Sequence, residues 1–242
     1  MISAILFDLV GTLIEETSKV LNTEQGYYEI QVKAIHRSLE KDDISVDWPS
    51  FKNYYEQVRI RQKARSRRTL REYDMCKRVS DTLRFFNYDV SSISNIMRRA
   101  VDAYINIYID SLKISQSTYD LLRKMAAKYK LGLVTNFAYS PGAYRILDQF
   151  DLRPFFKALV VSGEVGWKKP SQHIFEIALS QLSIKPEEAI FVGDDYEVDI
   201  VGAKKAGMRT IFLCKEPANN EKADFTIESL IELPSAIKRL SQ

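Results

Sequence analysis

The stretch LGLVTNFAYSPGAYRILDQFDLRPFFKALVVS, residues 131–162, carries the pattern that decides the fold. Two short apolar runs, 131–135 and 158–162, flank a helical pattern at 143–150. Short runs rich in β-branched residues are typical of strands that are buried on both faces of a parallel sheet. The stretch therefore predicts a strand–helix–strand unit of an α/β protein.

The same alternation continues on both sides of this unit. We expect further strands at 3–7, 189–192 (AIFV) and 210–213 (TIFL), and helices at 118–129, 171–182, 199–206 and 227–240. Strands that alternate with helices predict a Rossmann-like parallel sheet with helices on both faces.

Residues 17–110 interrupt the alternation, because they are helical in pattern almost throughout. The expected helices cover roughly 20–40, 49–70, 72–87 and 91–110, with ends uncertain by about 2–4 residues. We therefore predict a core made of residues 1–15 and 112–242, with an inserted all-helical domain at 16–111.

Composition narrows the class of protein. The 242 residues are 45% hydrophobic and 28% charged, and no apolar run approaches the ~20 residues of a membrane-spanning helix. Asp8 interrupts the apolar N-terminus, which argues against a signal peptide. Cys76 and Cys214 form no CxxC spacing, and a reducing cytoplasm is the expected location. The net charge of +3 gives no support for a nucleic-acid partner.

Polar side chains follow the predicted strands where ligands bind in an open parallel sheet. A carboxylate nucleophile needs a substrate held in line, and a phosphate substrate needs cations and hydroxyl or amide donors. Magnesium favours one or two carboxylates together with substrate oxygens and water. The candidates are Asp8 with Gly11 and Thr12, Thr135 with Asn136, Lys168 with Lys169, and Asp194 with Asp195 and Asp199.

Four motifs in this order, FDLVGTL (7–13), VTN (134–136), KKP (168–170) and VGDDYEVD (192–199), resemble those of the haloacid dehalogenase superfamily of hydrolases. The helical insert after the first motif is similar to the C1 type of cap domain in that superfamily.

The resemblance implies a role for each matching position. Asp8 is the expected nucleophile, and Lys169 the expected lysine that neutralises charge. Substrate contacts are expected from Thr12, Thr135, Asn136 and Lys169, with Thr135 also counted as catalytic. Mg²⁺ is expected on Asp8, the backbone carbonyl of Val10, Asp194 and Asp195, with Asp199 orienting its neighbours.

Val10 departs from the pattern of the superfamily's phosphatases, which have an aspartate there as general acid and base. Because valine transfers no proton, a phosphatase with good leaving groups is the expectation. The alternatives are a 2-haloacid dehalogenase and a binding or regulatory protein that has lost efficient catalysis. The adjacent Asp194 and Asp195 favour the metal-dependent phosphatase, because their mutual repulsion needs a compensating cation.

A basic run lies within the predicted insert. Seven of the thirteen residues from Arg59 to Arg71 are Lys or Arg, and none is acidic. The run is interpreted as a solvated helix face, with recruitment of an anionic, phosphorylated small molecule as the alternative. The substrate's identity and the oligomeric state stay open.

Overall fold

The structure is a computed structural model that describes residues 2–17, 24–215 and 221–240. Its contacts divide the chain into two compact units. The core unit comprises Met1–Glu15, Lys113–Phe137 and Leu147–Gln242, and the helical unit comprises Glu16–Leu112 and Ala138–Ile146. The predicted core, residues 1–15 and 112–242, also contains Leu112 and 138–146, which these contacts place in the helical unit. The functional domain boundaries stay a prediction.

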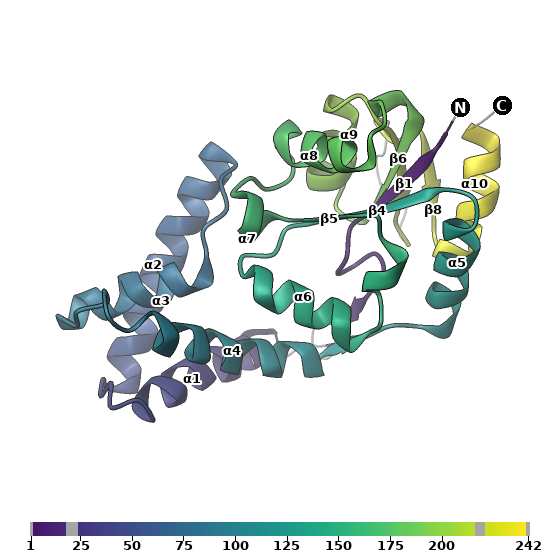
Figure 1. Cartoon of the computed structure of the whole chain (residues 1–242). Coiled ribbons are helices and arrows are strands. Elements are labelled where there is room, and N and C mark those ends of the chain that lie inside the picture. Colours follow the sequence, from purple (N-terminus) through teal and green to yellow (C-terminus); the bar gives the residue numbers. More distant parts are fainter. Residues whose placement is uncertain (1, 18–23, 216–220, 241–242) are drawn as a thin grey trace. The chain divides into compact units, whose positions relative to one another are not determined.

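The core unit is built on a six-stranded parallel sheet in the order β5-β4-β1-β6-β7-β8 (Figure 1). This confirms the predicted α/β class. The strands are β1 (Ala4–Phe7), β4 (Lys130–Thr135), β5 (Ala158–Val161), β6 (Ala189–Gly193), β7 (Arg209–Leu213) and β8 (Phe225–Ile227).

The register of the central strands places three chain segments at one edge of the sheet. Phe7, the last residue of β1, pairs with Leu133 of β4 and Val192 of β6. All four residues of β1 are fully buried, as its unbroken apolar sequence requires. The residues that follow these strands therefore meet at the carboxyl edge of the sheet.

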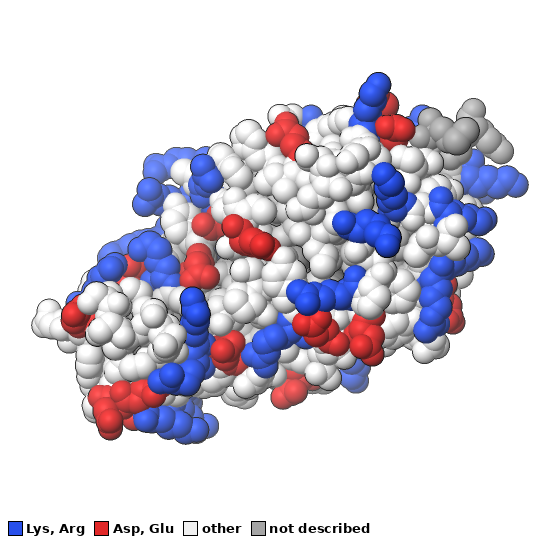
Figure 2. Space-filling view, viewed as in Figure 1, with Lys and Arg blue, Asp and Glu red and all other residues white. Residues whose placement is uncertain are grey.

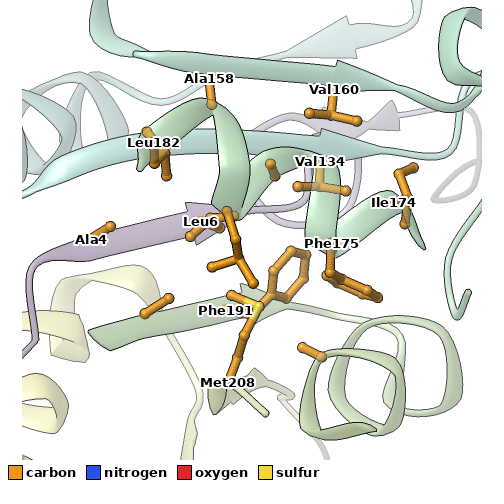
Figure 3. Close-up of a cluster of buried hydrophobic side chains, with 14 residues drawn as sticks. Ala4, Leu6, Val134, Ala158, Val160, Ile174, Phe175, Leu182, Phe191 and Met208 are labelled. Carbon is orange, nitrogen blue, oxygen red and sulfur yellow. The ribbon is translucent and has the colours of Figure 1, made fainter. Parts of the chain in front are cut away.

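Helices cover both faces of this sheet. On one face α8 (Gln172–Leu182) and α9 (Val201–Lys205) pack together, and α5 (Gln116–Ala126) and α10 (Leu233–Leu240) lie on the other (Figure 1). In Figure 3, Leu6 and Val134 of the sheet pack with Phe175 of α8. Every second strand residue faces this cluster, as the two-residue period of a strand requires.

Between residues 24 and 112 the described chain forms four α-helices, as the sequence predicts. They are α1 (Glu24–Glu40), α2 (Trp48–Thr69), α3 (Met75–Leu83) and α4 (Ser94–Asp110). Asp47 and Asp74 cap α2 and α3 by accepting hydrogen bonds from Ser50 N and Lys77 N. Helix α1 packs on α4 and α2 on α3. The first four residues of the helix expected at 20–40 lie outside the described residues.

Some predicted boundaries are wrong. The helix expected at 227–240 begins only at Leu233, because Phe225–Ile227 forms β8 beside β7. The helix expected at 199–206 starts earlier, as the π-helical segment η5 (Tyr196–Ile200), and continues as α9. Ser162, expected at the end of a strand, begins the short helix α7 (Ser162–Val165).

The remaining elements are short or connect these layers. They are β2 (Glu15–Glu16), β3 (Leu112–Lys113), α6 (Ser140–Gln149), η2 (Arg84–Phe86), η3 (Arg153–Phe155), η4 (Pro186–Glu188) and η6 (Leu230–Glu232). Within the described ranges, no helix combines the length and the apolar character needed to cross a bilayer.

Candidate active site

Asp8 lies directly after β1, at the carboxyl edge of the sheet. Its backbone N–H donates to the carbonyl of Val192 at 3.0 Å, which fixes the backbone to β6. The residue is 8% exposed, and its Oδ1 atom lies 2.6 Å from Nζ of Lys169. The carboxylate is thus nearly buried, held in place and paired with a cation.

Lys169 is the centre of a buried ion-pair network. Its Nζ atom lies 2.6 Å from Oδ1 of Asp8 and 2.6 Å from Oδ1 of Asp199, and the residue is 1% exposed. Asn136 fixes the backbone of Lys169 from both sides, because its Oδ1 accepts from Lys169 N at 2.8 Å and its Nδ2 donates to Lys169 O at 3.1 Å. The amide of Asn136 therefore positions the lysine.

A group of three carboxylates gathers at this edge. Asp8, Asp194 and Asp199 each offer an oxygen atom within 4.8 Å of the other two. Thr12 donates to Oδ1 of Asp194 at 3.0 Å. Gly11 has φ +102°, and a Cβ atom there would lie 2.2 Å from Oδ2 of Asp194. Glycine is therefore needed where the loop after β1 passes the carboxylate of Asp194.

Asp195 and Asp199 have different surroundings, although both follow β6. Asp195 is exposed, and its Oδ1 accepts from Val198 N at 2.9 Å as the N-cap of η5. Asp199 is 1% exposed, and it faces Lys169. Among the described residues Asp195 lies outside the three-carboxylate group, so its expected role as a metal ligand has no support from the geometry.

The remaining expected site residues lie in the same loops. Thr135 ends β4 and is 3% exposed. Thr12 contacts Asp194, as described above. Val10 forms a β-bridge with Ile14 and brings an aliphatic side chain to the loop after β1. The structure thus brings all the predicted motifs to one edge of the sheet.

Comparison with known proteins agrees with this arrangement. The family described as haloacid dehalogenase-like hydrolase matches residues 2–207. The chain belongs to this family. It is a hydrolase with the family's fold, as the four motifs predict.

Individual relatives of this haloacid dehalogenase-like hydrolase are phosphatases by name. The glyceraldehyde 3-phosphate phosphatase of Methanocaldococcus jannaschii is 28% identical over 247 residues, which cover 100% of both chains. The protein of the same name from Methanopyrus kandleri is 35% identical over 147 residues, 58% of this chain and 60% of that protein. The 2-haloacid dehalogenase structure from Pseudomonas syringae covers 99% of this chain and 100% of its own, with a TM-score of 0.70 and 20% identity. That likeness shows the fold alone.

The electrostatics of the hydrolase site are those of several acids around one buried cation. Burial disfavours the charged form of Lys169, but Asp199 and Asp8 outweigh it and raise the pKa of the lysine. Desolvation raises the pKa of Asp8 against the opposing effect of Lys169. It also raises the pKa of Asp199 to about 6, with Lys169 opposing and Asp8 adding to the shift. The pKa of Asp194 is raised by desolvation and by the charge of Asp199.

Burial is the largest cause of the raised carboxyl pKa values, and the charges of the neighbouring carboxylates add to it. Three carboxylates gather around one ammonium group, so among the described residues the fully ionised group carries more negative than positive charge. Carboxylate oxygens at this spacing are the donors that hard divalent cations prefer. The donor set therefore fits a divalent cation.

Two structural roles escaped the sequence analysis of this hydrolase. Asp199 was expected to orient its neighbours, and the structure makes it the second direct partner of Lys169. Ser162 is fully buried, and its Oγ accepts from Phe137 N at 2.8 Å. It therefore ties the loop after β4 to the end of β5. The position of Ser162 as the last residue of a predicted strand was the one available signal.

Proposed function

We propose that this hydrolase is a magnesium-dependent phosphatase of small phosphorylated compounds, with Asp8 as its nucleophile. The main support for this proposal is the buried carboxylate of Asp8, which pairs with Lys169. Asp194, a further member of the three-carboxylate group, lies beside it. The phosphatase names of its relatives support the reaction class. The name glyceraldehyde 3-phosphate phosphatase also supports a small metabolite as the substrate.

The reaction begins at an oxygen of Asp8. That oxygen forms a bond to the substrate's phosphorus, and the bond from phosphorus to the leaving oxygen breaks. The leaving group departs with the electron pair, and an aspartyl phosphate remains on Asp8. Water then attacks this intermediate, releases phosphate and restores the carboxylate.

Neighbouring residues hold the charges of this reaction in place. Lys169 contacts Asp8 directly, so its ammonium group offsets the negative charge that builds up at the reacting centre. Thr135 and Asn136, at the end of β4, are the proposed groups for substrate oxygens. Asn136 also holds the backbone of Lys169, so it has a positioning role as well.

Asp8, Asp194 and the carbonyl of Val10 are the proposed ligands of Mg²⁺. When bound, the ion neutralises negative charge on the phosphoryl group and the site's carboxylates. Asp195 is left out of this ligand set, because its carboxylate caps η5. The raised pKa values of Asp8 and Asp194 support a site that gains from a divalent cation.

Val10 limits the substrates that this site can use. A general acid contributes about 10²–10⁴-fold to a rate, and valine offers no proton to a departing alkoxide. Aryl and acyl phosphates leave as stable anions, so they lose least from the missing acid. We therefore propose substrates with good leaving groups. The helical insert is the proposed cap, which would select among them.

Hydrolysis of p-nitrophenyl phosphate tests this proposal, because its leaving group needs little protonation. We expect activity with Mg²⁺ that is lost in EDTA and in Asp8→Asn, and a gain in Val10→Asp. Asp194→Asn and Asp195→Asn separate the two adjacent acids. The first should lose nearly all activity, and the second should lose much less. Full activity in Asp8→Asn would contradict the proposal.

Val10 is also the observation that favours a second candidate, the 2-haloacid dehalogenase. A departing halide needs no proton, so an aliphatic residue at this position costs that reaction nothing. This candidate predicts halide release from 2-haloacids in the presence of EDTA. The absence of release across several haloacids would remove it.

A further inference from the structure

The helical unit contains a cavity of about 470 Å³ between α2 and α3. Its size lies within the range of about 300–1,000 Å³ that is typical of small-molecule sites. We propose that this cavity binds a phosphorylated compound that carries an aromatic ring, of the size of a mononucleotide. The proposal rests on the cations at its wall, the aromatic rings beside them and a buried donor that has no hydrogen-bond partner in the described part of the chain.

The first two cations come from α2. Arg61 and Arg65 are four residues apart, so both point to the same side of the helix, and both line the cavity. Both are exposed, and among the described residues neither forms an ion pair with an Asp or Glu. Their guanidinium groups are therefore available to an anion, which arginine can bind through two parallel hydrogen bonds.

The opposite wall carries two more cations from α3 and the turn after it. Lys77 and Arg84 line the cavity, and both pair with Asp81, at 3.1 Å and 2.7 Å. One carboxylate thus faces two cations. Together with the two arginines of α2, the lining residues carry an excess of positive charge. Figure 2 shows Lys and Arg side chains gathered where Figure 1 places α2.

Aromatic rings lie next to the arginines. The guanidinium carbon of Arg61 is 5.8 Å from the ring centroid of Phe85, and that of Arg65 is 5.7 Å from the centroid of Tyr73. Phe85 is 43% exposed, although phenylalanine is usually buried. The Phe85 ring stacks on that of Tyr54, with 4.6 Å between the centroids, and its exposed part beside the cations offers a contact surface for a ligand ring that carries a negative group. The charges alone would not select such a ring.

Gln62 adds a buried donor to the same cavity. It is 7% exposed, and its Oε1 accepts from Nε of Arg78 at 3.0 Å. That bond fixes the orientation of the amide, and the Nε2 group has no hydrogen-bond partner among the described residues. Buried donors in folded proteins nearly always have a partner. A carbonyl or ring nitrogen of a bound ligand would supply one.

The cavity shares no residue with the site around Asp8, and its ligand could be a substrate of that site or a separate effector. In either case the ligand carries a phosphate group and an aromatic ring, and the cavity binds it in the same way. Binding can be measured without turnover, so the test of this inference is independent of the proposed phosphatase reaction.

Isothermal titration calorimetry of the full chain in the Asp8→Asn background, with EDTA present, tests the inference. The probes are AMP, adenosine and inorganic phosphate, which separate the ring from the charge. We expect AMP to bind at least about tenfold more tightly than either part. The double substitution Arg61→Ala with Arg65→Ala should weaken the binding of AMP about tenfold or more.

Two further variants control for charge and for the buried donor. Arg67→Ala with Arg68→Ala removes two exposed cations of α2 that do not line the cavity, and it should leave AMP affinity within about twofold. Gln62→Glu keeps an acceptor for Arg78 and removes the Nε2 donor, so it should lower the affinity for AMP. Thermal unfolding checks that each variant is folded.

The outcomes decide the inference and then the source of the ligand. AMP affinity that is unchanged in the Arg61 and Arg65 variant, or no tighter than that of phosphate, would overturn it. If the Arg61 and Arg65 variant binds AMP more weakly, hydrolysis assays with Mg²⁺ follow, in which Asp8 is intact. Hydrolysis of AMP with a raised KM in the variant assigns the cavity to the substrate. A changed rate with p-nitrophenyl phosphate, without AMP hydrolysis, assigns it to an effector.

Discussion

Replacing Lys169 by methionine removes the cation that joins Asp8 to Asp199. The Nζ atom lies 2.6 Å from a carboxylate oxygen of each, and the side chain is 1% exposed. Methionine has a similar length without the charge, and it suits the position above the ring of Phe191, whose centroid is 5.3 Å from Nζ. The substitution therefore tests charge rather than packing.

The magnitude follows from the two carboxylates that are left behind. Asp8 and Asp199 have oxygens within 4.8 Å of one another. At an effective dielectric constant of about 20, two charges at that distance repel by roughly 3.5 kcal/mol. Breaking a buried ion pair costs about 3–5 kcal/mol, which agrees with this figure. We expect Lys169→Met to lose about 3–5 kcal/mol of unfolding free energy at pH 7, together with all activity.

The pH dependence identifies the cause of that loss. A proton can replace the missing cation by neutralising one of the two acids, so the pKa of that carboxyl rises above its unfolded value. A raised carboxyl pKa contributes stability at low pH that is lost as pH rises. The destabilisation by Lys169→Met should therefore be smaller at pH 5 than at pH 8.

Urea unfolding in EDTA at several pH values between 5 and 8 measures this dependence. Lys168→Met is the matched control, because that side chain is half-buried and should cost less than about 0.5 kcal/mol. A loss in Lys169→Met that is the same at pH 5 and pH 8 would refute the reasoning, because it would assign the effect to packing.

Three further predictions concern neighbours of this network. Asp199, whose pKa is about 6, should stay protonated in the folded state between pH ~4 and ~6, so it should make metal-free wild type lose stability with rising pH by up to ~1.4 kcal/mol per pH unit. Because the pKa values of Asp8 and Asp194 are raised as well, urea unfolding should show a shallower slope in Asp199→Asn than in the wild type, and an unchanged slope would contradict this role of Asp199. Gly11→Ala brings a Cβ against Asp194 at positive φ, so it should lower the unfolding free energy by about 1–3 kcal/mol and raise the Mg²⁺ concentration for half-maximal activity. An unchanged Mg²⁺ requirement would contradict Asp194 as a proposed ligand. Asn136→Ala leaves the N–H and carbonyl of Lys169 without their amide partner, so thermal unfolding should show a loss of about 1–3 kcal/mol of stability. Unchanged stability would mean that water replaces the amide, and it would contradict this positioning role.

The sheet was predictable because its strands are short, apolar and separated by helical patterns. The strand Phe225–Ile227 was missed because FTI has neither the length nor the apolar run of the others, and it forms through pairing with β7. The start of α9 was misplaced because a π-helical segment adds a turn before it. The first error comes from pairing with a strand that is distant in sequence, and the second from a change of helix type that the apolar pattern does not show.

The site was predictable as a set of segments but less so as a set of contacts. Asp194, Asp195 and Asp199 are all acids after one strand, and the family resemblance assigned Mg²⁺ to the first two and an orienting role to Asp199. The local pattern does not show which of the three carboxylates reaches Lys169. The turn that begins η5 directs Asp195 to Val198 N and Asp199 to Lys169. The positioning role of Asn136 likewise depends on a contact across 33 residues of sequence, which only the folded chain reveals.

The central claim is that Asp8 attacks phosphorus and carries the phosphoryl group. Acid-quenching the enzyme during turnover of p-nitrophenyl phosphate with Mg²⁺, followed by peptide mass spectrometry, tests it most directly. The account predicts one added phosphoryl group on the peptide that contains Asp8, with more of it in wild type than in Val10→Asp, and none in Asp8→Asn. Turnover that continues in Asp8→Asn, with no modified peptide in the wild type, would contradict it.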